Sequence, residues 1–446
     1  MEHVVGMGLA AGSGVRFRPL SLKARGYLRA KAAVRLLGRR VLDWLVAILQ
    51  QQGIDDFVMI TKGKENRYQI RSMLGYGDAL GVRVRYSPVT QDATNSGSAD
   101  ALLTNLDYFD IHDTAFVFPT DSVLDIDLPA MLAAHHRSKA VVTIAAAQQP
   151  AELIAGRYGL IDCDARGRVR GFIEKPTLSE IYTHYGVAAE TPALLPPLVT
   201  NAGFYLVDAL ALREIADDPA LRAQRTRHLD IGGDLLPWLV EQGYPVYAHR
   251  IGRMGDLGNI PSYLETMLDV LHGRFQSLSA LMPQVYPDSD YVVIDHETLE
   301  MTDPVSKLTL SEKLERGMVE LQPPLRIGKF VRIYPGARLA HCNIDDECEI
   351  REGSTIVRSS IGSGSIIGPY STIEDTLTGI MVELRSSREM PVMLRRYVAI
   401  GDEVVLRGPV EVSDGVTIFP RLRIPAEIHI PAGTEIETSD QVVELL

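Results

Sequence analysis

The sequence has few cysteines: Cys163, Cys342 and Cys348 are the only three among 446 residues. Their number is odd and their spacing matches no metal-binding pattern, which argues against a disulfide framework or a zinc site and favours a reducing compartment. Long apolar runs are also missing, since no segment approaches the roughly 20 apolar residues of a membrane-spanning helix. The apolar run at the N-terminus has no basic flank, and glycines and Arg16 follow it too soon for a signal peptide. We therefore expect a cytoplasmic protein that does not bind membranes.

The sequence also lacks an excess of positive charge. Its 45 Lys and Arg residues are outnumbered by 57 Asp and Glu residues, and the formal net charge is -12. Such a balance disfavours general binding to nucleic acid, so an anionic substrate needs a local cluster of Lys and Arg. Hydrophobic residues make up 46% and charged residues 23%, which is typical of a globular protein, and the length suggests two or three domains.

The first 280 residues alternate strand-like and helix-like stretches. Short apolar runs predict strands at residues 4–9, 57–61, 82–87, 115–119 and 141–147. Helical periodicity predicts helices at residues 41–53 and 65–75. Apolar strands separated by helices favour a largely parallel sheet covered on both faces, in which ligands bind beyond the carboxyl ends of the strands.

The last 120 residues repeat an aliphatic residue at every sixth position. The longest unbroken series is Ile400, Leu406, Val412, Ile418, Ile424, Ile430 and Ile436. This period predicts a triangular parallel β-helix, against the alternative of a β-sandwich. Residues 374–397 interrupt the repeat and contain Arg385, Arg388, Arg395 and Arg396, which indicate either a solvated loop or an anion or effector site at a subunit interface.

The residues between these regions lose the alternation and carry prolines and charges, so we expect a linker there. The predicted domains are a catalytic domain at 1–280, a linker or adapter at 281–325 and a β-helix at 326–446. Flat β-helix faces favour assembly into a homo-oligomer, a dimer or a tetramer.

Several motifs follow one another in a familiar order. "GLAAGSGVRFRPL" (Gly8–Leu20) is by itself a weak glycine-rich signal. Further motifs are "NSGSADAL", "YGLIDCDARGRVRGFIEKP", "NAGFYL", "DIGGDLLP" and "RMGDLGNI". Together they resemble the sugar-1-phosphate nucleotidyltransferases, most of all the ADP-glucose pyrophosphorylase branch. The resemblance implies an α/β fold with a mostly parallel, Rossmann-like (GT-A-type) domain followed by a left-handed parallel β-helix of hexapeptide repeats.

The resemblance also implies the reaction and its residues. An oxygen of a sugar 1-phosphate attacks the α-phosphorus of an NTP, and the protein mainly positions two polyanions and spreads the developing charge. The catalytic cations implied are Arg16, Lys31 and Lys175. The nucleotide-binding residues implied are Ala10, Ala11, Gly12, Gly14, Gln91, Gly97, Ser98 and Asp121.

The same resemblance assigns a magnesium site and an acceptor site. Asp121 and Asp256 are the expected Mg²⁺ ligands, with Asp125 and Asp127 as secondary candidates. The residues expected to bind the acceptor are Gly159, Glu174, Lys175, Asn201 and Gly203. Taken singly, each of these residues also fits an ordinary turn, cap or strand-end position.

Departures from the family pattern surround the expected pockets. Ala32 replaces a proline, Thr120 a glycine and Asn259 a threonine, Met254-Gly255 stands where a tryptophan is common, and about five residues are added before Ala30. They favour an unusual acceptor such as a cyclitol 1-phosphate. Two alternatives stay open: a catalytically silent regulatory subunit that binds nucleotide sugar, and an acyltransferase in the β-helix, where His341 and His429 are the available histidines.

Overall fold

The structure is a computed structural model that describes residues 3–10, 17–24, 27–187, 195–282 and 291–445. The chain forms two compact units. The first unit comprises Met1–Gly12, Leu45–Thr120 and Leu124–Met254, and the second comprises Ser13–Trp44, Asp121–Val123 and Gly255–Leu446. In the described part of the chain, no helix is long and apolar enough to cross a membrane.

A nine-stranded sheet forms the centre of the first unit among the described residues. Its strands are β1 (Val4–Ala10), β6 (Asp56–Thr61), β7 (Arg83–Tyr86), β8 (Thr114–Pro119), β10 (Val142–Gln149), β11 (Leu160–Cys163), β12 (Val169–Ile173), β13 (Leu198–Asp208) and β14 (Val246–Arg250). Strands β7, β6, β1 and β8 are parallel, and β13 runs antiparallel to β8, β10 and β11. The expected strands are thus confirmed, and the sheet is mixed beyond β8.

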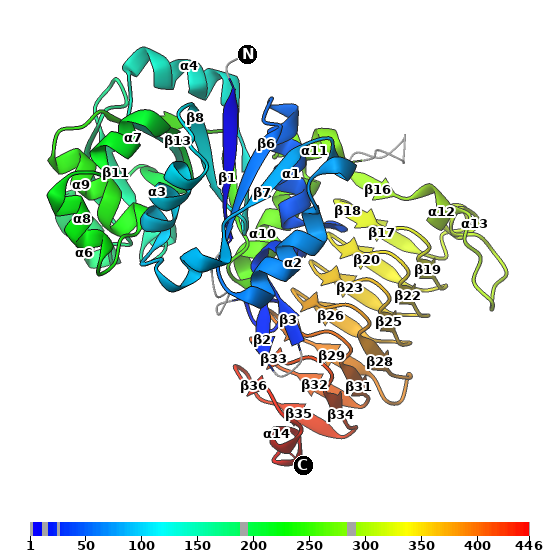
Figure 1. Cartoon of the computed structure of the whole chain (residues 1–446). Helices are drawn as coiled ribbons and strands as arrows, with labels where there is room; N and C mark the ends of the chain where they lie inside the picture. The colour runs from blue at the N-terminus through cyan, green and yellow to red at the C-terminus, as the bar shows by residue number, and fades with distance from the viewer. Residues whose placement is uncertain (1–2, 11–16, 25–26, 188–194, 283–290, 446) are drawn as a thin grey trace. The chain divides into compact units, whose positions relative to one another are not determined.

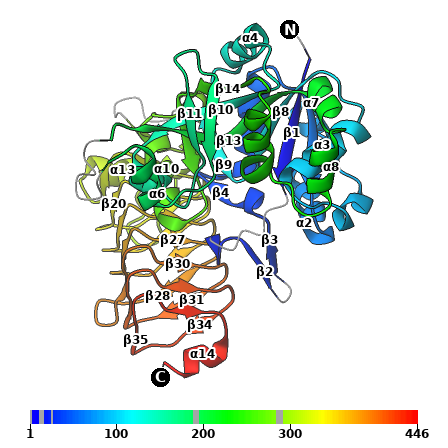
Figure 2. The same cartoon turned by 90° about the vertical axis from the view of Figure 1, so that its left-hand side faces the viewer.

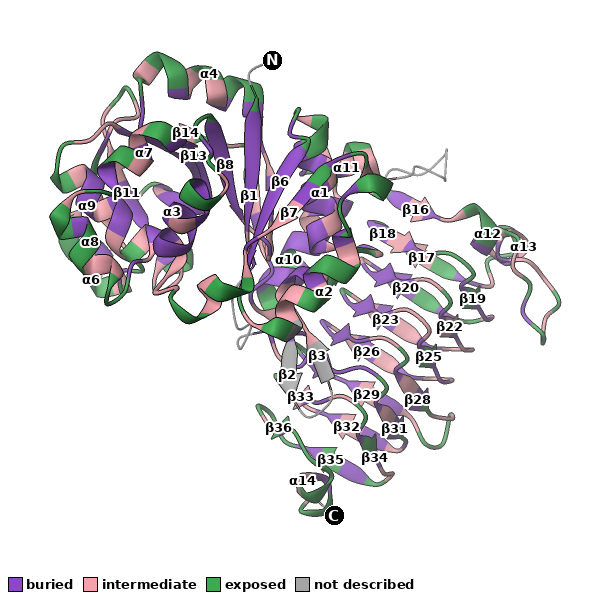
Figure 3. Cartoon of the chain, viewed as in Figure 1, coloured by how far each residue is buried: buried purple, intermediate pink, exposed green. Residues whose placement is uncertain are grey.

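Helices cover the sheet. They include α1 (Val41–Gln51), α2 (Lys64–Leu74), α3 (Ser98–Tyr108), α4 (Leu128–Ser138), α5 (Ala151–Ile154), α6 (Leu178–His184), α7 (Ala209–Ile215), α8 (Pro219–Arg225) and α9 (Leu236–Glu241). Nearly every residue of β1, β6 and β8 is buried (Figure 3). Because successive side chains of a strand point to opposite faces, these strands are covered on both faces, as expected.

Three parallel sheets run through the second unit and form a parallel β-helix, whose coils stack from β16 to α14 (Ser439–Val443) (Figures 1 and 2). The first sheet is β16 (Val292–Ile294), β18 (Leu325–Ile327), β21 (Asn343–Ile344), β24 (Ser360–Ile361), β27 (Leu377–Thr378), β30 (Ala399–Ile400), β33 (Thr417–Ile418) and β36 (Glu435–Ile436). The second is β17 (Glu320–Gln322), β20 (Arg338–Ala340), β23 (Thr355–Val357), β26 (Thr372–Glu374), β29 (Val392–Leu394), β32 (Val410–Val412) and β35 (Ile428–Ile430). The third is β19 (Arg332–Ile333), β22 (Glu349–Ile350), β25 (Ile366–Ile367), β28 (Glu383–Arg385), β31 (Val405–Arg407) and β34 (Arg423–Ile424).

The sixth-position residues form the interior of this β-helix. All seven from Ile400 to Ile436 are at most 1% exposed, and they belong to one continuous apolar cluster. The parallel β-helix is therefore confirmed, while its left-handed sense stays a prediction.

The repeat continues through residues 374–397, where the sequence suggested a break. Val382, Leu384, Val392 and Leu394 are buried in the same interior, so the extra residues are confined to the connection between β28 and β29. The arginines there are paired along the coils. Arg385 pairs with Glu383, Arg395 with Glu411, and Arg388 donates to the hydroxyl of Tyr370.

One end of the β-helix carries short helices and a buried ion pair. Besides α14, this unit includes the helices α10 (Ile260–Leu271), α11 (Gln276–Leu281), α12 (His296–Leu299) and α13 (Leu310–Glu315). Lys313 of α13 is 1% exposed, and its Nζ lies 2.9 Å from Oδ2 of the fully buried Asp303. The pKa of this carboxyl falls to about 2, because hydrogen bonds from Ser306 and Lys313 outweigh the opposing effect of burial.

Candidate functional site

The carboxyl ends of three parallel strands form the edge at which the family motifs lie. Ala10 at the end of β1 is paired with Thr61 at the end of β6, and Leu9 is paired with Pro119 of β8. The amide of Asn66 donates to the carbonyl of Ala10. The expected phosphate-binding residues that follow, Ala11, Gly12, Gly14 and Arg16, lie outside the described residues.

Thr120 ties two of these strand ends together. Its side chain is buried, and its hydroxyl donates to the carbonyl of Leu9 at 3.3 Å. The family glycine at this position could not make this bond. Because of this bond, the backbone directly before Asp121 has less conformational freedom than it would have with a glycine.

Gln91 lies in a 3-10 helix, Val89–Ala93, at the edge of a small polar cavity of about 10 Å³. Three side-chain oxygens that have no hydrogen-bond partner among the described residues belong to residues lining it: Oγ1 of Thr61, Oε1 of Gln91 and Oδ1 of Asn105. Buried acceptors without donors are costly, and a volume of this size suits a single water molecule. The buried oxygen of Gln91 is therefore expected to accept a hydrogen bond from that water molecule, and the role of Gln91 in reading a base stays a prediction.

Gly97 and Ser98 begin α3, where Asp230 holds them. Both the backbone N–H and the hydroxyl of Ser98 donate to Oδ1 of Asp230, at 2.8 and 3.0 Å, and the hydroxyl accepts the N–H of Ile231. A Cβ on Gly97 would lie 2.4 Å from the carbonyl oxygen of Leu229, so only glycine fits there. Asp230 is the first residue of "DIGGDLLP". Its hydrogen bonds to the first residue of α3 could not be predicted from the sequence, because 132 residues separate the partners.

Glu174 lies between two glycines with one oxygen unused. Its Oε1 accepts from Nζ of Lys175 at 2.6 Å, while its buried Oε2 has no partner among the described residues. A Cβ on Gly159 would lie 3.0 Å, and one on Gly232 2.7 Å, from that oxygen. Lys175 is half exposed and has a left-handed backbone with φ of 45°, which is strained for a lysine and is typical of functional positions. The structure thus brings Gly159, Glu174 and Lys175 together.

Asn201 and Gly203 shape an irregular part of β13. The N–H of Asn201 donates to the carbonyl of Gly159, which places it beside the Glu174 group. Its side chain donates to the hydroxyl of Tyr205 and accepts the N–H of Gly203, both at 2.9 Å. Gly203 has φ of 81°, and the register with β10 shifts at this point. The amide of Asn201 is therefore used within the strand.

Lys31, Asp121 and Asp256 belong to the second unit. Lys31 begins a 3-10 helix, Lys31–Ala33, and its Nζ lies 2.6 Å from Oδ2 of Asp121. Asp121 directly precedes β9 (Ser122–Asp125), which pairs with β15 (Arg253–Asp256). Gly252 donates its N–H to the carbonyl of Asp125, and a Cβ on Gly255 would lie 2.9 Å from Val123. One residue further in this antiparallel register, Asp256 comes opposite the Asp121 end of β9.

This arrangement fits a divalent cation shared with phosphate oxygens. Oδ1 of Asp121 accepts no hydrogen bond from a described residue, and Oδ1 of Asp256 accepts the N–H of Gly258 at 2.7 Å. Two carboxylates plus substrate oxygens are a common ligand set for Mg²⁺. The described residues contain no group of three His, Cys, Asp or Glu side chains arranged around a metal.

Two of the departures have local structural causes. Asn259 caps α10 by accepting the N–H of Ser262 at 2.9 Å, a role in which asparagine is favoured over threonine. A Cβ on Gly255 would lie 2.3 Å from Cγ2 of Thr266, so the larger residue common in the family has no space here. Asp127, a secondary metal candidate, caps α4 through the N–H of Ala130.

Comparisons with known proteins agree with the motifs. A family model described as nucleotidyl transferase matches residues 5–273. The chain is similar to the UTP–glucose-1-phosphate uridylyltransferase of Synechocystis, with 26% identity over 378 residues that cover 83% of this chain and 85% of the relative. It is also similar to the glucose-1-phosphate adenylyltransferase of Trichlorobacter lovleyi, with 26% identity over 445 residues that cover 94% and 92% of the two chains. Since the family model spans more than half of the chain, this protein belongs to the nucleotidyl transferase family.

Proposed function

We propose that the chain transfers a nucleotidyl group from an NTP to a sugar or cyclitol 1-phosphate. A phosphate oxygen of the acceptor bonds to the α-phosphorus, the bond from the α-phosphorus to the α–β bridging oxygen breaks, and pyrophosphate leaves with that oxygen. The observation that carries the proposal is the ion pair between Lys31 and Asp121. Asp121 directly precedes β9, and β9 pairs with β15, the strand that ends in Asp256. Relatives named for the transfer of uridylyl and adenylyl groups to glucose 1-phosphate support it.

We assign the charged groups of the site as follows. Asp121 and Asp256 would hold Mg²⁺, which when bound neutralises charge on the triphosphate. Lys31 shifts from the carboxylate of Asp121 toward phosphate when substrate enters, and its flexible stem allows that movement. Arg16 is proposed to face the departing pyrophosphate, with backbone N–H groups of Gly12 and Gly14 beside it.

Acceptor recognition is assigned to the Glu174 group. The unused Oε2 of Glu174 is a buried acceptor that suits a ring hydroxyl, and Lys175 suits the acceptor phosphate. A cyclitol ring offers the same hydroxyl pattern without a ring oxygen, so this pocket chemistry accommodates it as well as a sugar. Gln91 is the group proposed to read the base.

We also propose a cytoplasmic homo-oligomer, a dimer or a tetramer, in which residues 1–280 catalyse and residues 326–446 assemble the subunits. Residues 281–325 connect the two and contribute β16 and β17 to the β-helix. Buried thiols support a reducing compartment. Cys342 and Cys348 are fully buried and free, and burial raises the pKa of Cys342 to about 12.

The test is a pyrophosphate-release screen of the full-length protein with Mg²⁺, in which five NTPs are crossed with sugar and cyclitol 1-phosphates. We expect release with at least one pair and no release when Mg²⁺ is replaced by EDTA. Nucleotide-sugar binding without turnover for any pair would instead identify a silent regulatory subunit. Release that needs no added metal and survives EDTA would contradict the assigned magnesium site.

A further inference from the structure

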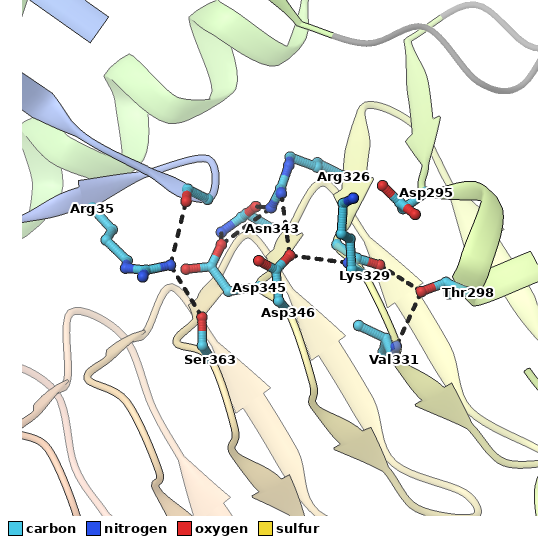
Figure 4. Close-up of polar contacts among 12 residues, drawn as sticks. Arg35, Asp295, Thr298, Arg326, Lys329, Val331, Asn343, Asp345, Asp346 and Ser363 are labelled. Atoms are coloured by element: carbon cyan, nitrogen blue, oxygen red, sulfur yellow. Dashed lines mark hydrogen bonds and ion pairs between the residues drawn. The ribbon is translucent and has the colours of Figure 1, made fainter. Parts of the chain in front are cut away.

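The segment that carries Lys31 is attached to the β-helix on both sides of that residue. Before it, the guanidinium of Arg29 forms an ion pair with the carboxylate of Asp402. After it, Nη1 of Arg35 donates to Oγ of Ser363 at 3.3 Å (Figure 4). Further along, the backbone of Gly38 lies against the guanidinium of Arg326, so closely that a Cβ would come within 2.3 Å of Nη2.

Asp402 is built as a rigid anchor. Its side chain is 4% exposed, its Oδ1 accepts the N–H of Ile380 at 2.9 Å, and its Oδ2 pairs with Arg29. A Cβ on Gly379 would lie 2.2 Å from Oδ1, so the neighbouring coil closes around the carboxylate. An ion pair with one fixed and largely desolvated partner holds geometry better than a pair between two mobile surface side chains.

A tight turn connects this anchor to Lys31. Arg29 precedes Lys31 by two residues, and the N–H groups of Ala33 and Val34 donate to the carbonyls of Ala30 and Lys31 at 2.9 and 3.0 Å. Ala32 and Val34 are buried, and the carbonyl of Arg35 accepts from the hydroxyl of Tyr263 at 2.7 Å. A turn held in this way has little freedom, so a shift at Arg29 is passed to the backbone of Lys31.

We propose that Arg29 is a positioning residue, and that its ion pair with Asp402 makes the β-helix set the position of the Lys31 ammonium group. The β-helix then has a role in the reaction in addition to assembly. The effect on catalysis rests on the proposed function, because it needs Lys31 to contact a phosphate. The effect on the position of Lys31 does not.

The first test removes the ion pair from either side. Arg29→Ala takes away the cation, and Asp402→Asn takes away the charge while its side-chain oxygen can still accept from Ile380. We expect each to lower kcat about tenfold or more while KM changes less than about threefold, since small misplacements of a catalytic group reduce the rate steeply. The combined loss in the double variant should be clearly smaller than the product of the two single losses, because both changes remove the same ion pair.

A matched control is Arg358→Ala. Arg358 pairs with Asp375, which is 8% exposed, in another arginine–aspartate pair of the β-helix, and within the described residues neither has a hydrogen bond or ion pair with the Lys31 segment. Its kcat should stay within about twofold of the wild type. An equal loss of kcat in this control would overturn the proposal, because general weakening of the β-helix would then explain the result. A normal kcat in Arg29→Ala would overturn it as well.

The second test asks whether Arg29 acts through Lys31. In a Lys31→Ala background, Arg29→Ala should cause no further loss of pyrophosphate release. A tenfold loss in that background overturns the proposal while leaving the proposed function intact.

A third measurement does not depend on activity. Lysines are dimethylated with ¹³C-formaldehyde, and the Lys31 signal is assigned with Lys31→Arg. We expect this signal to move toward those of exposed lysines in Arg29→Ala and Asp402→Asn but not in Arg358→Ala. An unmoved signal overturns the positioning role even if the wild type shows no turnover.

Discussion

The β-helix and the loops at the strand ends of the nine-stranded sheet differ in how far their buried polar side-chain atoms are hydrogen-bonded. Within the described residues, side-chain oxygens without partners include those of Thr61, Gln91 and Glu174, which belong to loops or strand ends where the family motifs lie. In the β-helix, buried Ser354, Ser365 and Ser371 all have hydrogen-bond partners, as does the buried Lys313. Oε2 of Glu349, which has no hydrogen-bond partner among the described residues, forms an ion pair with Arg351. Most buried polar groups of the β-helix are thus paired within the fold, whereas these loops and strand ends keep acceptors without a partner among the described residues, of which we propose that Oε2 of Glu174 binds substrate. Substitutions in the loops should therefore affect mainly activity, and substitutions in the β-helix mainly stability.

The largest difference between the effect on activity and the effect on stability is expected for Asp121→Asn. The change should reduce pyrophosphate release by about a thousandfold, because it removes the negative charge that is proposed to hold the metal cation and that pairs with Lys31. The free energy of unfolding should change by less than about 1 kcal/mol, since the Lys31–Asp121 pair is partly exposed. Steady-state kinetics and urea denaturation measure the two effects.

Asp127→Asn is the matched control, because asparagine also caps helices and Asp127 caps α4. Activity should stay near that of the wild type. If Asp127→Asn were the inactive variant and Asp121→Asn the active one, the assignment of the metal-binding carboxylates would be wrong.

The opposite pattern is expected for Lys313→Met at the end of the β-helix. The change leaves the carboxylate of Asp303 buried without its cation, and breaking a buried pair costs about 3–5 kcal/mol. Urea denaturation should show this loss, while kcat at low temperature stays within about twofold of the wild type. Restored stability in the double variant Lys313→Met/Asp303→Asn would confirm that the unpaired charge is the cause. A stable single variant would show that Asp303 reaches water.

The two regions also differ in how much of them the sequence predicts. A repeat at every sixth residue specifies the interior of the β-helix, because each aliphatic side chain meets the same surroundings one coil later. The strand ends follow from apolar runs, but the contacts that organise them do not. Ser98 meets Asp230, Thr120 meets Leu9, and Arg29 meets Asp402 across 373 residues, so no local spacing connects them. The resemblance to the family predicts that Glu174, Gly159 and Lys175 bind the acceptor. Only the fold shows that one oxygen of Glu174 has no partner among the described residues.

Acidification should affect the two regions in separate pH ranges. His135 of α4 is 2% exposed and bonded to Oγ1 of Thr143 at 2.8 Å; burial, together with nearby His136, lowers its pKa from 6.5 to about 4. The unfolded chain therefore binds a proton first, and stability falls as the pH drops from 6.5 toward 4, by about 2 kcal/mol at pH 5. For Asp303, with a native pKa of about 2 against an ordinary 3.8, the loss comes only below pH 3.8.

Urea denaturation of the wild type and of His135→Gln at pH 7.5 and pH 5 measures the first effect. The variant should lose about 2 kcal/mol less than the wild type over this interval, and Lys313→Met should lose as much as the wild type. Equal losses in the wild type and in His135→Gln would show that His135 is not the group that titrates.

The smallest effect is expected for Glu174→Gln. Glutamine keeps the size of the side chain and one oxygen but no charge, so the bond to an acceptor hydroxyl weakens without leaving a cavity. We expect the KM for the acceptor to rise about tenfold and the KM for the NTP to stay unchanged, with no change in the urea midpoint. Glu180→Gln is the control, because glutamine also completes the capping box of α6. A larger rise in the KM for the NTP than in the KM for the acceptor would assign the unpartnered oxygen of Glu174 to the nucleotide. A side chain that only stabilises the fold would shift both KM values together.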